Sequence, residues 1–135
     1  MTSTLSVKTE DRPGALGRVA RTLANAGINI DAFQADGGTL RVVVQDGDAA
    51  TNALRAAGIA CQAAETLEVR VPNRPGELGN LGEALGKAGV NIQASFGSAH
   101  DGRIYLQVDN PAAARPVLQR FSAPVPAGAG TVRNR

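Results

Sequence analysis

Cysteine, histidine and aromatic side chains are scarce in this chain of 135 residues. The single cysteine, Cys61, and the single histidine, His100, exclude a disulfide framework and a Cys/His zinc site within one chain. We therefore expect no metal and no cofactor, and we interpret Cys61 as a small hydrophobic residue in a reducing compartment. Three Phe, one Tyr and no Trp provide few rings on which bases could stack, which argues against a nucleic-acid partner.

The chain also lacks a strong excess of charge and any long apolar run. Its 14 basic and 12 acidic residues give a net charge of +2 at pH 7, and the arginines are spread along the sequence, so attraction to phosphate backbones or anionic lipid should be weak. No signal-peptide pattern and no apolar run of membrane-spanning length is found. We expect a soluble, cytoplasmic protein without a membrane partner, and a hydrophobic content of 43% is enough for a packed core.

An internal repeat is the most informative feature that is present. Residues 12–17, Arg-Pro-Gly-Ala-Leu-Gly, return at 74–79 as Arg-Pro-Gly-Glu-Leu-Gly. Residues 26–30, Ala-Gly-Ile-Asn-Ile, return at 88–92 as Ala-Gly-Val-Asn-Ile. Both blocks share one offset, since 74 − 12 = 62 and 88 − 26 = 62. A duplicated unit explains this common register, so each half should form a complete or nearly complete small fold.

Hydrophobic periodicity predicts the same order of elements in each half: strand, helix, strand, strand, helix, strand. In the first half, alternation at Leu5 and Val7 predicts the opening strand, and a period of 3.6 residues from Leu16 to Leu23 predicts a helix that stops at Gly27. The remaining predicted elements are strands at 28–35, 40–45 and 59–65 and a helix at 48–57 in the first half, and strands at 67–71, 90–96 and 104–109 and helices at 78–88 and 110–121 in the second.

These elements predict an α+β fold in which two antiparallel sheets each carry both of their helices on one face. We expect a first module at residues 1–65 and a second at 66–122. Residues 123–135 should be an edge strand or a loose tail, because Pro124 and Pro126 forbid a central strand. Asp11 and Asn73 precede the first helix of each half and are candidates for capping it.

The two β-α-β-β-α-β units resemble a pair of ACT domains, which have a ferredoxin-like fold. The resemblance rests on Arg-Pro-Gly-x-Leu after the first strand and on Ala-Gly-(Ile/Val)-Asn-Ile before the second strand of each half, and it covers about residues 4–121. It implies a non-catalytic regulatory protein that binds a free amino acid, in the manner of stand-alone tandem ACT proteins. It also implies modules that pair side by side, a homodimer, and an enzyme or regulator as partner.

The start of the first helix is suited to an amino acid. The backbone N–H groups of Gly14, Ala15 and Leu16 and the helix dipole can receive a carboxylate, while Asp11 and Asn29 can accept from the ammonium group. By the resemblance, the ligand lies where the first loop of one module meets the second strand of its neighbour. The candidate ligand-binding residues are Asp11, Arg12, Pro13, Gly14, Ala15, Leu16, Asn29 and Ile30 in the first half and Asn73, Arg74, Pro75, Gly76, Glu77, Leu78, Asn91 and Ile92 in the second.

The two candidate sites differ in charge. Ala15 of the first loop corresponds to Glu77 of the second, whose carboxylate would repel a ligand carboxylate unless it points away or engages the ammonium group. We therefore expect unequal sites, with the first loop binding more tightly. A repeated Pro-Gly turn and an asparagine after a helix end can also serve folding alone.

Two other functions remain open at this stage. A ligand-free dimerisation module could act on a partner protein through an exposed sheet edge at 28–35. An RNA-binding module has the same order of strands and helices, but it needs aromatic residues on its central strands. Tyr105 is the one aromatic residue on the two strands concerned, 40–44 and 104–108, so this alternative is disfavoured.

Overall fold

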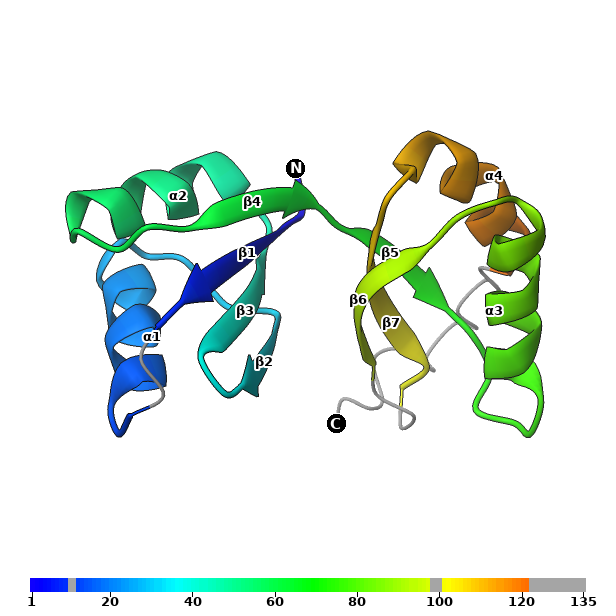
Figure 1. Ribbon diagram of the computed structural model, residues 1–135, viewed down its shortest axis with the longest axis horizontal. Helices are drawn as coiled ribbons and strands as arrows, with labels where there is room; N and C mark the ends of the chain where they lie inside the picture. Colours follow the sequence, from blue (N-terminus) through cyan, green and yellow to red (C-terminus); the bar gives the residue numbers. More distant parts are fainter. Residues whose placement is uncertain (10–11, 98–100, 122–135) are drawn as a thin grey trace. The chain divides into compact units, whose positions relative to one another are not determined.

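The computed structural model describes residues 1–9, 12–97 and 101–121, which belong to two compact units, Met1–Thr66 and Leu67–Arg135 (Figure 1). The expected α+β class is confirmed, and each unit has an antiparallel sheet with its helices on one face. The elements of the first unit are β1 (Ser3–Lys8), α1 (Ala15–Asn25), β2 (Ala32–Asp36), β3 (Thr39–Val44), α2 (Gly47–Ala56) and β4 (Gln62–Glu65).

The sheet of the first unit has the strand order β2-β3-β1-β4, and every neighbouring pair is antiparallel. Alternate residues of β1 and β3 point toward the helices and pack against α1 and α2, as the alternation of apolar residues predicts. The core of this unit consists of Leu5, Val7, Val19, Leu23, Leu40, Val42, Val44, Ala50, Leu54 and Ile59. The two edge strands of the sheet are β2 and β4.

Glycine ends α1 as the sequence predicts. Gly27 has a φ of 76°, a left-handed conformation that costs glycine little because it has no Cβ. Its N–H donates to the backbone oxygen of Ala24 at 2.9 Å, and the next N–H, of Ile28, donates to that of Leu23 at 2.9 Å. These two bonds form a Schellman motif. Gly58 after α2 and Gly89 in the second unit repeat it.

The strand predicted at 28–35 begins later, at Ala32. Ile28 and Ile30 are half-buried and pack against the core of the first unit, so the chain leaving α1 first fills that core. Regular strand pairing starts beyond Asp31, whose N–H donates to the backbone oxygen of Val43 at 2.8 Å. The alternation at 28–30 therefore reflects core packing and not strand pairing, and this part of the prediction is wrong.

The elements of the second unit are β5 (Leu67–Arg70), α3 (Glu77–Lys87), β6 (Ile92–Gly97), β7 (Arg103–Val108) and α4 (Pro111–Phe121). The sheet order is β5-β7-β6, again antiparallel. Asn110 caps α4, because its side-chain oxygen accepts from the N–H of Ala113 at 3.1 Å. The edge strand or tail predicted at 123–135 lies outside the described residues. No helix in the described ranges has both the length and the apolar character needed to cross a membrane.

Candidate functional site

The two Arg-Pro-Gly loops have the same backbone conformation at their glycines. Gly14 precedes α1 with φ 90° and ψ −9°, and Gly76 precedes α3 with φ 90° and ψ −17°. Each glycine is the N-cap residue of its helix, and neither helix has a side-chain cap hydrogen bond. The prediction that Asn73 caps α3 is therefore wrong, and Asp11 lies outside the described residues. A left-handed N-cap requires glycine here, and glycine leaves the helix start uncovered by a side chain.

The loops use part of their hydrogen-bonding capacity internally. The Ala15 N–H donates to the backbone oxygen of Arg12 at 3.4 Å, and the Glu77 N–H donates to that of Arg74 at 3.2 Å. The N–H groups that follow in the first turn of each helix lack an intrahelical acceptor, because no helical carbonyl lies four residues before them. These groups therefore remain the natural donors for an anionic ligand.

The candidate residues on the loops are mostly at the surface. Arg12, Pro13 and Gly14 are exposed in the first loop, and Asn73, Arg74, Pro75 and Gly76 are exposed in the second. Leu16 is 37% exposed and its counterpart Leu78 is 67% exposed. These two apolar side chains at equivalent helix positions are therefore available to a ligand or to another protein surface.

An ion pair distinguishes the second loop from the first. The Arg74 guanidinium donates to Oε2 of Glu77 through Nη2 at 2.7 Å and through Nε at 3.1 Å. Residue 15, the equivalent of Glu77, is alanine and provides no such carboxylate. The carboxylate of the second loop is thus engaged by the arginine of the same loop.

Asn29 and Asn91 both take part in contacts near the start of their second strands. Asn29 Nδ2 donates to Oδ1 of Asp31 at 3.0 Å, and the Gln45 side-chain amide donates to the other oxygen of that carboxylate. The backbone N–H of Asn91 donates to Oδ1 of Asp109 at 2.9 Å. Both asparagines are exposed. The amide nitrogen of Asn29 thus makes a contact within its own unit, and a role of this side chain toward a ligand stays a prediction.

The isoleucines that follow the asparagines differ in exposure. Ile30 is half-buried and packs against the core of the first unit, whereas Ile92 is 38% exposed. Core packing therefore accounts for Ile30, and Ile92 retains a side chain at the surface.

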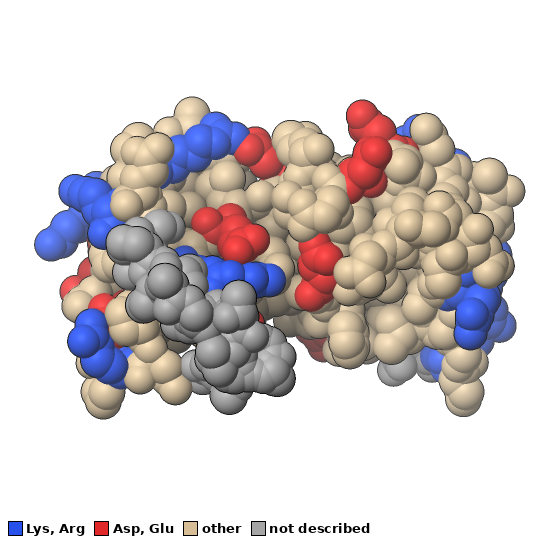
Figure 2. All heavy atoms as spheres, turned by 180° about the vertical axis from the view of Figure 1, so that it is seen from behind, with Lys and Arg blue, Asp and Glu red and all other residues tan. Residues whose placement is uncertain are grey.

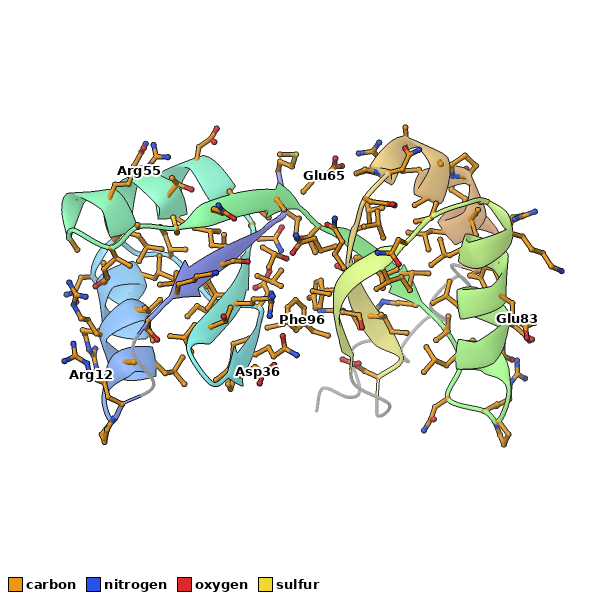
Figure 3. All side chains as sticks on the ribbon, viewed as in Figure 1. Arg12, Asp36, Arg55, Glu65, Glu83 and Phe96 are labelled. Atoms are coloured by element: carbon orange, nitrogen blue, oxygen red, sulfur yellow. The ribbon has the colours of Figure 1, made fainter. Side chains whose placement is uncertain are left out.

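A cleft of about 200 Å³ adjoins the first loop. The end of β1, the start of α1 and the turn between α2 and β4 line it, and its charged residues are Lys8, Arg12 and Arg18. Arg18 Nη2 donates to the backbone oxygen of Ala57 at the end of α2 at 3.1 Å, which fixes the guanidinium at this place. Figure 3 shows Arg12 at the start of α1 on the outer side of the unit. In Figure 2, Lys and Arg gather over the end of the first unit that carries α1.

Sequence reasoning missed Lys8 and Arg18. The sequence did mark Arg18 as different, because the equivalent position of the second half is Asn80 while the surrounding motif is unchanged. Lys8 gave no such signal, because its counterpart Arg70 carries the same charge.

Two further features lie away from the loops. A hollow of about 820 Å³ lies between α2 and the edge strand β4 and shares no lining residue with the loops. On the helix-free face of the second sheet, Arg103 Nη1 lies 3.4 Å from the Tyr105 hydroxyl and Arg103 Nε lies 3.2 Å from Oε2 of Glu68. The hydrogen bond with Tyr105 and the charge of Glu68 raise the pKa of Arg103, so this cluster is an ion pair that joins two strands.

No group of three or more His, Cys, Asp or Glu side chains suited to a metal ion occurs in the part of the chain that the structure describes.

Comparison with family models finds one match, over less than half of the chain. The family model described as ACT domain matches residues 3–58, which lie within the first unit. No curated protein matches the chain in sequence.

Solved structures resemble the chain over most of its length. The protein BT0572 from Bacteroides thetaiotaomicron is 28% identical, with a TM-score of 0.77 over 87% of this chain and 86% of that one. The regulatory subunit of aspartate kinase from Thermus flavus is 17% identical, with a TM-score of 0.68 over 89% of this chain and 92% of that one. E. coli aspartokinase III, in complex with lysine and aspartate, is 14% identical, with a TM-score of 0.62 over 89% of this chain and 30% of that one. The last two likenesses concern the fold.

Proposed function

We propose that the protein is a non-catalytic regulator that binds a free amino acid at the Arg-Pro-Gly loop of its first unit. The second unit is, in this proposal, a second ACT module, so the chain is a tandem pair with modules at 1–65 and 66–122. The regulated partner is an enzyme or a regulator encoded on another chain.

The geometry of the first loop carries this proposal. Gly14 begins α1 in a left-handed conformation without a side-chain cap, and the loop borders a cleft that contains basic side chains. A carboxylate approaching this helix start meets backbone donors and the positive end of the helix dipole. The ACT domain match at residues 3–58 and the fold-level likeness to the regulatory subunit of aspartate kinase support a regulatory role.

The proposed ligand is held where this loop meets an ACT module of a second chain. The edge strand β2 supports this arrangement, because its outer edge has no strand beside it in the first sheet. The outer N–H and C=O groups of an edge strand are suited to pairing with another chain. A homodimer that pairs at β2 would bring a second module to the first loop.

A thermal melt of the full chain with each of the twenty amino acids tests the proposal. A ligand that binds only the folded state adds about 2.7 kcal/mol to stability at one hundred times its dissociation constant. For a domain of this size the melting temperature should rise by on the order of 10 °C. If no amino acid raises the melting temperature, the proposed function is wrong.

A ligand-free interaction module is the second candidate function. Phe33 of the edge strand β2 is 60% exposed, and Leu16 of α1 is 37% exposed, so apolar side chains are available to a partner protein. In that case the same melts would show no response to amino acids, and sedimentation would show assembly that does not depend on ligand.

A further inference from the structure

A stripe of small residues runs along one side of the first helix of each unit. Positions three, four and seven apart lie on the same side of an α-helix. The α1 stripe consists of Gly17, Ala20 and Ala24, and the α3 stripe consists of Gly79, Gly82 and Gly86. Arg18, which bonds to Ala57 at the end of α2, lies on a different side of α1. The α1 stripe therefore faces away from α2.

The glycines of the α3 stripe have no explanation within the described part of the chain. None of them has a positive φ, and a Cβ at any of the three would meet nothing within 4 Å among the described residues. All three are exposed. Glycine destabilises a helix interior relative to alanine, and close approach of another backbone is a reason to keep it. The α3 stripe is thus suited to contact with a further helix.

One charged residue stands beside each stripe, and the two charges have opposite signs. Arg21 lies one helical turn after Gly17, and Glu83 lies one turn after Gly79 (Figure 3). The two occupy equivalent positions, since 83 − 21 = 62. Both are exposed, and neither has an ion-pair partner among the residues that the structure describes. Each stripe therefore carries a charge that complements the other stripe.

The size of the neighbouring side chains also differs between the units. Phe33 of β2 pairs with the core residue Val42, so its ring points to the side of the sheet that carries the helices, yet it is 60% exposed. Ser95 is its equivalent in β6, where it pairs with the core residue Leu106 and is also exposed. The first unit thus has a bulky apolar side chain where the second unit has a small one.

The outer edges of β2 and β6 have no neighbouring strand within the described sheets. The opposite edges are β4 and β5, and these two strands are joined through Thr66 alone. The chain connection therefore uses one edge of each sheet and leaves the β2 and β6 edges to a second chain.

We propose that the first unit of one chain pairs with the second unit of another copy, with the α1 stripe against the α3 stripe and β2 beside β6. This inference rests on the homodimer at β2 proposed above and names the surface that β2 meets. Two-fold symmetry gives two identical contacts in each dimer. Arg21 and the partner subunit's Glu83 attract each other at both contacts, because each lies near the middle of its stripe. Pairing of like units would instead bring two copies of Arg21 together, and two copies of Glu83.

Charge reversals in the full chain test which units pair. Sedimentation velocity over a concentration series gives the dissociation constant of the homodimer for the wild type, Arg21→Glu, Glu83→Arg and the double variant. Each single variant sets like charges against each other at both contacts, so we expect dimerisation to weaken about tenfold. The double variant should return to within about threefold of the wild type. An unchanged dissociation constant in both single variants, or a wild type that stays monomeric, overturns this pairing.

Two controls and one further variant locate the contact. Arg55→Glu makes the same change of charge on the exposed surface of α2 (Figure 3), and it should change the dissociation constant less than about threefold. Gly82→Gln places a long side chain on the α3 stripe without loss of helix propensity, so it should weaken dimerisation at least about tenfold. Asn80→Gln, off the stripe on the same helix, should leave it unchanged. Equal weakening in Arg55→Glu, or none in Gly82→Gln, overturns the location.

The amino-acid melts test the proposed ligand separately. A chain that responds to an amino acid but never dimerises overturns this pairing and leaves ligand binding standing. A dimer that follows the charge reversals without any response to amino acids supports this pairing and overturns the proposed ligand.

Discussion

Alanine in place of Gly102 should destabilise the second unit by about 2–5 kcal/mol. Gly102 has a φ of +70°, and a Cβ at this position would lie 2.2 Å from the backbone oxygen of Val71. A left-handed conformation costs an L-residue roughly 1–2 kcal/mol. Relief of the overlap adds about 1–3 kcal/mol, because it must displace the bond from the Val71 N–H to the Gly102 oxygen, which is 2.9 Å long.

Gly37 provides the control for this experiment. It lies in the corresponding hairpin turn of the first unit, has a φ of +58°, and a Cβ there would meet nothing within 4 Å. Gly37→Ala should therefore cost only the conformational term of roughly 1–2 kcal/mol. Urea unfolding gives the free energies, and hydrogen exchange of the β5 and β7 amides assigns the loss to the second unit. If both variants lose the same stability, contact with Val71 contributes nothing and the reasoning is refuted.

Three further outcomes are expected. Gly14→Val should abolish the amino-acid response in the melt series, because a β-branched residue is strained at a φ of +90° and would cover the start of α1. Gly76→Val introduces the same strain in the second loop and should preserve the response. Asn29→Ala removes one donor to Asp31, so it should lower the stability of the ligand-free protein by less than about 1 kcal/mol. It should reduce the ligand-induced rise in melting temperature by more than this, and equal losses of stability with and without ligand would make Asn29 purely structural. Pro116 lies inside α4, so Pro116→Ala should raise the free energy of unfolding by about 1–3 kcal/mol in urea titrations, and an unchanged midpoint would show that the helix already accommodates the ring.

Local rules predicted the order of elements and the helix ends well. The common offset of 62 between the two halves indicated a repeated fold, and glycines after the helices predicted where α1 and α3 end because only a left-handed residue completes the Schellman bonds. The same rules failed at the helix starts. Asn73 was expected as the cap of α3, whereas Gly76 is its N-cap residue, as Gly14 is for α1. Asp11, the other expected cap, lies outside the described residues.

The candidate site could be predicted only in part from the sequence. The Arg-Pro-Gly loops were visible as a repeated motif, but the cleft depends on residues far apart in the chain. Arg18 and Ala57 are 39 positions apart, and no spacing rule links them. Asn29 looked equally suited to a ligand and to a backbone contact, and only the position of Asp31 beside it shows which bond the side chain makes.

The ion pair between Arg74 and Glu77 affects how binding curves of this chain should be interpreted. An exposed pair of this kind contributes about 0.2–1 kcal/mol, so opening it would weaken a second binding event by no more than about fivefold. If the second loop also binds, two sites whose affinities differ by this factor produce a Hill slope slightly below one without any communication between them. Such a slope would therefore report unequal halves, and Glu77→Ala should restore it toward one.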